Sequence, residues 1–146
     1  MSYINKDDLF DELGEQTLIQ LTDNDESGEI DDAKIAKAIS HAQGVCDAYL
    51  RTRYALPVPA TPMVKTINID IAIFHLYKRA EFDEGVYKVR KNANDDGIKL
   101  LTAINQGKAG LDVPANEETI ETPATTDRIL TNKSNAVFTD GKLSNY

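Results

Sequence analysis

Residues 35–59 read IAKAISHAQGVCDAYLRTRYALPVP, and this stretch decides how the chain folds. Its apolar side chains recur in steps of four and three residues, at Ile35, Ile39, Ala42, Cys46 and Tyr49. Because 3.6 residues complete a helical turn, these side chains share one face of a helix. The two X-Pro pairs at residues 56–59 then require extended backbone, since a residue before proline is disfavoured in the helical region. The sequence therefore predicts a long helix that ends in a rigid apolar segment, the proline strap (residues 53–59), which another element must cover.

Two more long helices and two short ones are predicted around this stretch. A helix begins at Thr61-Pro62, because proline suits a first turn, and its apolar residues on most sides predict a central position. A third long helix is predicted over residues 83–105, with a weak point at the polar residues 94–97 and one apolar face formed by Val86, Val89, Ala93, Gly97, Leu100, Leu101 and Ile104. Short helices over residues 7–13 and 15–21 must pack on the long ones. The predicted fold class is all-α, a small bundle of three long helices plus short N-terminal helices.

The composition changes after residue 111. Residues 112–146 are rich in Thr, Asn, Glu and Pro, show no helical period and contain two short apolar clusters, Ile129-Leu130 and Ala136-Val137-Phe138. Such a segment becomes ordered when a partner supplies the missing surface. We therefore predict a helical domain over residues 1–111 and an extended C-terminal arm over residues 112–146.

Composition excludes several classes of protein. Hydrophobic residues are 41% of the 146 residues and charged residues 27%, as in a globular domain. No apolar run approaches the roughly 20 residues that a membrane span needs, and the first residues lack the layout of a signal peptide, so an intracellular product is expected. A single cysteine cannot form an internal disulfide, and Cys46 lies on the apolar helix face, where a small buried side chain is expected.

Charge is distributed unevenly along the chain, whose net charge is −8. Residues 1–32 carry eleven Asp/Glu and one lysine, residues 33–111 carry twelve Lys/Arg and seven Asp/Glu, and residues 112–146 carry six Asp/Glu and three Lys/Arg. This layout suits packing of an acidic lobe of one copy against a basic face of the next, although a solvated acidic surface would look the same.

The loop that precedes the first long helix resembles a calcium-binding loop. Four residues have oxygen-bearing side chains at matching positions: Asp23, Asp25, Ser27 and Asp31. The twelfth position, which should supply a bidentate glutamate, is Lys34. The alternative interpretation is an Asp/Gly turn followed by a helix cap. Calcium binding by residues 23–34 is kept as the competing function, that of a monomeric regulatory domain.

No constellation for catalysis or for a cofactor is evident in the sequence. His41 and His75 lie in different predicted helices, and neither has a second His or Cys at ligand spacing. The basic pair Lys78-Arg79 could contact nucleic acid, but the acidic net charge and the scarcity of aromatic residues nearby favour a protein interface or a solvated surface. We therefore expect no enzyme activity, no metal and no cofactor.

The order of elements resembles the Mu-like bacteriophage neck protein family. The run RYALPVP, at the end of a helix and followed by an aliphatic helix with Asp70-Ile71-Ala72 and Leu76-Tyr77, is the specific part of the resemblance. GEID before the long helix, Asp47-Ala48-Tyr49-Leu50 within it and Gly107-Lys108 after the third long helix agree as well. The resemblance covers residues 9–111, and the C-terminal arm matches only loosely.

This resemblance implies a head-tail connector, or adaptor, in the neck of a tailed phage virion. Such a protein is made in the host bacterial cytoplasm and forms a ring, of twelve copies by the resemblance, beneath the portal protein. It joins the portal to the next neck or tail-completion protein and leaves a channel through which the genomic DNA passes without sequence-specific binding. No membrane contact is implied. The residues expected at its interfaces are Arg53, Tyr54, Leu56, Pro57, Lys78, Arg79, Ile129, Leu130, Val137 and Phe138.

Overall fold

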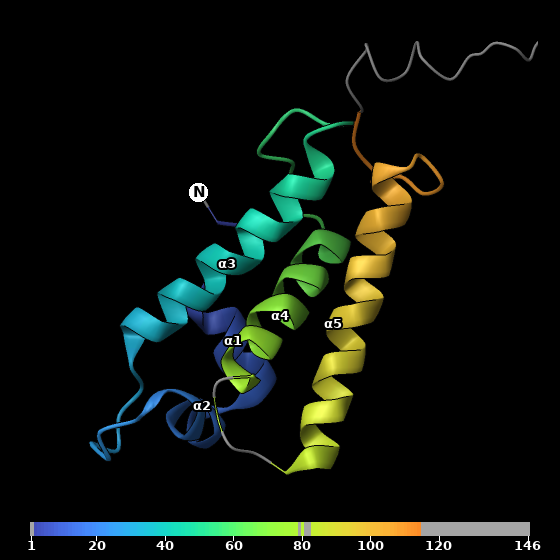
Figure 1. Ribbon diagram of the computed structural model, residues 1–146. Helices are drawn as coiled ribbons and strands as arrows, with labels where there is room; N and C mark the ends of the chain where they lie inside the picture. The colour runs from blue at the N-terminus through green and yellow to red at the C-terminus, as the bar shows by residue number, and fades with distance from the viewer. Residues whose placement is uncertain (1, 79, 81–82, 115–146) are drawn as a thin grey trace, which may run out of the picture.

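The computed structural model describes residues 2–78, 80 and 83–114, and over these ranges it contains five helices and no strand (Figure 1). The helices are α1 (Lys6–Leu13), α2 (Glu15–Thr22), α3 (Asp32–Leu50), α4 (Pro62–Tyr77) and α5 (Glu84–Asn105). The predicted all-α class, with three long and two short helices, is confirmed. Most of the predicted C-terminal arm, residues 115–146, lies outside the described residues.

Side-chain caps fix where the helices begin. Asn5 caps α1 through a reciprocal capping box with Asp8, and the carboxylate of Asp31 accepts the backbone N–H groups of residues 33 and 34 at the start of α3. Thr61 caps α4, whose first residue is proline, and Asp83 caps α5 in the same way as Asp31 caps α3. These caps satisfy donors that a helix leaves unpaired at its N-terminus.

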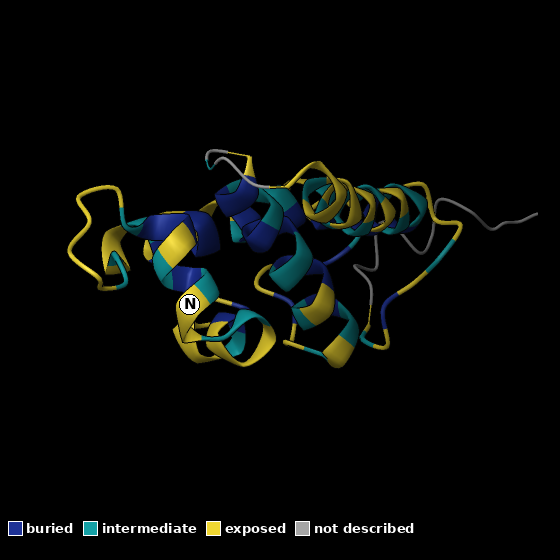
Figure 2. Ribbon diagram, turned by 90° about the horizontal axis from the view of Figure 1, so that it is seen from below, coloured by how far each residue is buried: buried dark blue, intermediate teal, exposed yellow. Residues whose placement is uncertain are grey.

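Helix α4 lies between α3 and α5 and contacts both along its length (Figure 1). The core draws on every helix, and its most completely buried large side chains are Leu9, Leu18, Ile35, Leu50, Ile73, Leu101 and Ile104. Figure 2 shows the buried residues gathered where the helices face one another and the exposed residues on the outer faces. The central position predicted for the second long helix is therefore confirmed.

The first half of helix α5 packs with a face different from the predicted one, whereas the second half packs as predicted. Val86 is 40% exposed and Val89 64% exposed, whereas Gly97, Leu101 and Ile104 are buried as predicted. In its first half the helix instead turns Tyr87 and Arg90 toward α4. The Tyr87 ring lies 5.6 Å from that of Phe74, and the Arg90 guanidinium lies 5.9 Å from the ring of Tyr77. The first half of α5 therefore packs on α4 through an aromatic contact and a cation–π contact, and its two valines remain exposed. The helix continues without a break through residues 94–97.

Candidate interaction surfaces

The proline strap is anchored to the body by Tyr3. Its hydroxyl donates a hydrogen bond of 2.5 Å to Asp47 Oδ1 on α3 and accepts one of 3.3 Å from the backbone N–H of Val58. Burial raises the pKa of Tyr3 above its ordinary value, and the bond to the Asp47 carboxylate raises it further. One hydroxyl thus joins the N-terminal segment, α3 and the strap.

A second tyrosine joins the strap to the segment that follows α5. Tyr54 is 4% exposed, and its hydroxyl accepts a 2.9 Å hydrogen bond from the backbone N–H of Leu111. Close by, Asn105 Nδ2 donates to the carbonyl oxygen of Tyr49 at 2.9 Å and to Thr52 Oγ1 at 2.8 Å. The C-terminal ends of α3 and α5 are therefore held together beside the strap.

The structure divides the predicted interface residues into three groups. Leu56, which is 37% exposed, Pro57 and Lys78 are accessible on the described surface. Tyr54 is used inside the chain instead, and Arg53 is half-buried with its guanidinium close to Gly107. The third group lies outside the described residues: Arg79, Ile129, Leu130, Val137 and Phe138.

The geometry of the loop after α2 does not support calcium binding. The Asp23 carboxylate accepts hydrogen bonds from the backbone N–H groups of Asp25, Ser27 and Gly28, which hold its pKa below the usual range. Lys34 Nζ donates to the carbonyl oxygen of Thr22 at 2.7 Å and so closes the loop at the position where a calcium site needs glutamate. In the described part of the chain, no group of three or more His, Cys, Asp or Glu residues could hold a metal ion.

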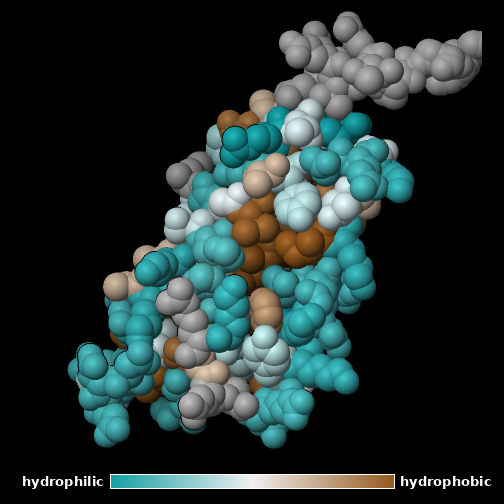
Figure 3. All heavy atoms as spheres, in the orientation of Figure 1, coloured by the Kyte–Doolittle hydropathy of each residue, from teal (hydrophilic) through white to brown (hydrophobic). Residues whose placement is uncertain are grey.

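An apolar hollow opens between α3 and α5, over α4. Figure 3 shows hydrophobic side chains gathered in a depression between the two helices, where α4 passes between them. The hollow has a volume of about 160 Å³. It is lined by His41, Val45, Ile71, Phe74, His75, Lys78, Asn94 and Ile98. Its lining therefore combines four apolar side chains, Val45, Ile71, Phe74 and Ile98, with four polar or basic ones, His41, His75, Lys78 and Asn94.

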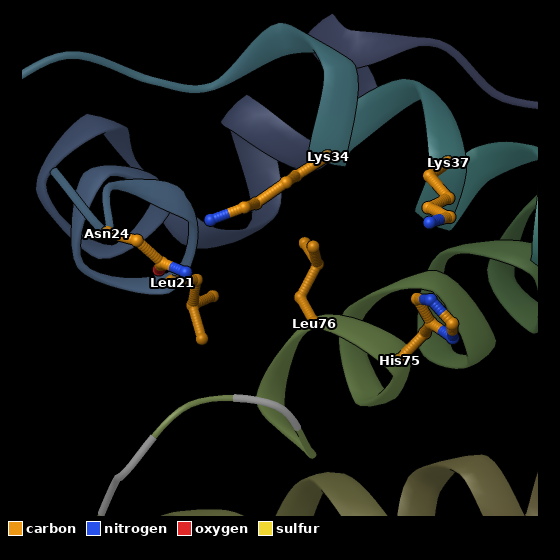
Figure 4. Close-up of a pocket in the computed structure, with 6 residues that line it drawn as sticks. All are labelled: Leu21, Asn24, Lys34, Lys37, His75 and Leu76. Carbon is orange, nitrogen blue, oxygen red and sulfur yellow. The ribbon is translucent and has the colours of Figure 1, made fainter.

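A larger basic hollow lies next to it, between the loop after α2, the start of α3 and the end of α4. Its volume is about 380 Å³, and Figure 4 shows the residues that line it, Leu21, Asn24, Lys34, Lys37, His75 and Leu76. His75 lines both hollows, and its ring stacks on that of His41 at 4.3 Å between centroids. The sequence placed the two histidines in separate helices and gave no sign that they meet.

Two ionisable groups inside the bundle have shifted pKa values. Cys46 is fully buried, and burial raises the pKa of its thiol to about 11. Burial also raises the pKa of the Asp70 carboxyl, and the negative charge of Glu12 adds to the effect, although Arg90 opposes it. Both pKa shifts follow mainly from burial of the two groups between the helices.

The anchoring roles of Tyr3 and Tyr54 were not predicted from the sequence. Both residues lie beside regular elements and not within a periodic pattern, so hydrophobic periodicity contains no signal for them. The position of Tyr54 inside RYALPVP was the one available hint.

Among the described residues, no helix combines the length and apolar character that crossing a bilayer requires.

Comparison with known proteins identifies the family. The family described as Bacteriophage Mu, Gp36 matches residues 3–128, which include all five helices. The Mu-like prophage FluMu protein gp36 of Haemophilus influenzae (strain ATCC 51907 / DSM 11121 / KW20 / Rd) is 28% identical over 120 residues, which cover 82% of this chain and 82% of that protein. The Mu-like phage origin expected from the sequence is confirmed, and the chain belongs to the bacteriophage Mu gp36 family.

Proposed function

We propose that this protein is a non-catalytic structural component of the phage virion neck, a head-tail connector that forms a ring beneath the portal. The observation that carries the proposal is the match to the phage Mu gp36 family over residues 3–128. In the ring, each copy contacts its two neighbours, the portal protein and the next neck or tail-completion protein. Twelve copies remain the expected number.

Two structural features support a role in assembly. Leu56 is exposed on a strap whose backbone is fixed by the Tyr3 and Tyr54 hydroxyls, so an apolar side chain is presented without an ordering cost when a partner binds. The separation of charge between residues 1–32 and residues 33–111 suits repeated contacts between unlike faces, which close into a ring when the rotation allows.

The acidic N-terminal lobe has a proposed place in this ring. Residues 1–32 carry eleven acidic residues and one lysine, so a surface built from them repels the phosphate backbone of DNA. We expect part of residues 7–32 to line the channel, where the genome must pass without adhering. A density map of the ring with residues 7–32 on its outer side would exclude this placement.

The connector proposal is tested by mixing the purified full-length chain with the portal protein of the same phage. We expect a ring complex by native mass spectrometry and by electron microscopy. Leu56→Glu should abolish co-purification with the portal complex, because it places a charge in an apolar contact. Ala36→Glu, at an exposed position on α3, is the matched control and should assemble normally. A wild-type chain that neither binds the portal nor forms a ring with it would overturn the proposal.

A further inference from the structure

The apolar hollow between α3 and α5 has the dimensions of a site for one aromatic side chain. Its volume is about 160 Å³. An apolar cavity of about 150 Å³ accepts a benzene molecule, so a single phenyl ring would fill this hollow. Val45, Ile71 and Ile98 contribute aliphatic surface, and Phe74 offers an aromatic partner for such a ring.

The edge of the hollow favours a ligand with a negative charge next to its apolar group. Lys78 lines the hollow and is exposed, so its ammonium group can meet a carboxylate that lies beside the apolar group of a ligand. The fitting ligand is therefore a peptide with an aromatic residue and a nearby carboxylate.

The chain itself contains such a peptide outside the described residues. Phe138 is followed two residues later by Asp140, within a segment, residues 112–146, that carries six acidic and three basic residues. In an extended peptide, residues i and i+2 point to the same side and lie about 7 Å apart. Phe138 could then enter the hollow while Asp140 reaches toward Lys78. The family match ends at residue 128, so this pairing is argued from the residues of this chain alone.

The segment is long enough to reach the hollow of a neighbouring copy. The described chain leaves the body after α5, at the end where Asn105 joins α5 to α3 (Figure 1). From there residues 115–137 can span up to about 75 Å, which is enough to reach an adjacent subunit. In a closed ring, each hollow would receive a segment and each segment would find a hollow.

We propose that residues 136–140 of one copy bind the apolar hollow of the next copy, with the Phe138 ring between α3 and α5 and Asp140 close to Lys78. The choice of an adjacent copy rests on the proposed ring. Binding of this kind links successive subunits in one direction around the ring.

Disulfide trapping with full-length chains tests the pairing directly. Ile98→Cys places a thiol in the hollow, and Thr139→Cys places one next to Phe138, which is retained, on the segment of a second, separately purified chain. Lys99→Cys is the matched control, because Lys99 is the next residue of α5 and its side chain is 77% exposed. The native Cys46 is fully buried and does not compete. Thermal melts of all variants establish that the bodies are folded.

We expect a two-chain disulfide product from the Ile98→Cys and Thr139→Cys mixture under mild oxidation, with and without the portal protein. It should exceed the product from the Lys99→Cys mixture at least about tenfold, because binding raises the effective concentration of the two thiols. The double variant in one chain should yield multimers. A product confined to single chains would show that each arm binds its own body, and equal products from both mixtures would show that the contact is random. Either result overturns the inference.

A second measurement separates this inference from the proposed function. The native mass of the wild type with the portal protein shows whether a ring forms, whereas disulfide trapping shows whether residues 136–140 bind the hollow. A ring without trapping leaves the connector proposal intact and rejects the arm contact, and absence of both rejects both. With a ring present, Phe138→Ala should weaken subunit association more than Val137→Ala, because residue 137 points to the opposite side of an extended segment.

Discussion

Replacing Tyr3 with phenylalanine removes one oxygen atom at the point where three segments of the chain meet. The hydroxyl donates to Asp47 Oδ1 at 2.5 Å and accepts from the Val58 N–H at 3.3 Å. A hydrogen bond to a charged group contributes about 1.5–3 kcal/mol to stability, and a buried N–H left without a partner costs about 1–3 kcal/mol. Because the bond from Val58 is long and the one to Asp47 is only partly buried, we expect Tyr3→Phe to lower the free energy of unfolding by about 2–3 kcal/mol.

This loss is measurable by urea unfolding and by thermal melts. For a chain of this size 1 kcal/mol corresponds to about 2–4 °C, so the melting temperature should fall by about 4–12 °C. Tyr87→Phe is the matched control, because within the described residues the contact of Tyr87 is made by its ring and not by its hydroxyl. That variant should melt within about 1–2 °C of the wild type. If the melting temperature of Tyr3→Phe equals that of Tyr87→Phe, the Tyr3 hydroxyl does not hold the strap. The proposal that the strap presents Leu56 rigidly would then be unsupported.

The same hydroxyl should make the stability of the protein depend on pH in the alkaline range. The pKa of Tyr3 is raised in the folded state, so its contribution to stability is complete below the unfolded value of 10.0 and declines as the pH rises above it. The difference in unfolding free energy between the wild type and Tyr3→Phe should therefore narrow above about pH 10. A difference that stays constant from neutral pH to about pH 11 would contradict the assigned hydrogen bonds.

Three further predictions, on Cys46, on two glycines and on Asp70, test separate parts of the fold. The Cys46 thiol is fully buried, and its pKa is raised to about 11. It should therefore react with a thiol reagent at least about a hundredfold more slowly in the native state than in urea. Rapid labelling of the native protein would contradict its burial. Gly44 lies at an exposed position inside α3, where an added Cβ meets nothing within 4 Å, so Gly44→Ala should stabilise the chain by about 1 kcal/mol. Gly107 has φ +77°, and an added Cβ would lie 2.8 Å from an Arg53 nitrogen, so Gly107→Ala should destabilise the chain by about 1–2 kcal/mol. Chemical denaturation measures both changes. The pKa of Asp70 is raised from 3.8 in the folded state, so the stability gained from its protonated form is complete below the unfolded pKa and is lost as the pH rises through the folded pKa. Asp70→Asn should therefore be more stable than the wild type near pH 7, and the difference in stability should shrink below about pH 4. Urea unfolding midpoints of the two proteins, measured at both pH values, would show this.

The helices were predictable because their signals are local. Caps such as Asp31 and Thr61, the proline in the first turn of α4 and the steps of three and four apolar residues each act within one or two turns of chain. The buried face in the first half of α5 was not predictable in this way. Hydrophobicity alone favours Val86 and Val89, whereas the face that packs is set by Tyr87 on Phe74 and by Arg90 on Tyr77, which are contacts between residues distant in sequence.

The candidate surfaces differ in how far the sequence revealed them. The strap was visible because proline restricts its own backbone and that of the preceding residue. The apolar hollow was not, because it is formed where three helices fail to fill the space between them, and its lining residues belong to three separate periodic patterns. The loop at residues 23–31 illustrates the opposite case. Its spacing resembles a calcium loop, yet the Lys34 ammonium and backbone N–H groups satisfy its oxygens.

The two proposed contacts of the ring should contribute in different ways. The strap is already ordered by Tyr3 and Tyr54, so Leu56 meets the portal protein with little loss of conformational entropy and can set the orientation of the chain on it. A segment that becomes ordered on binding loses entropy at that moment, so residues 136–140 should add affinity that is modest for each contact. Repeated around a closed ring, however, such contacts act together, because each bound arm raises the effective concentration of the next subunit. Loss of the strap contact should therefore abolish assembly, whereas loss of the Phe138 contact should leave rings that form and dissociate more readily.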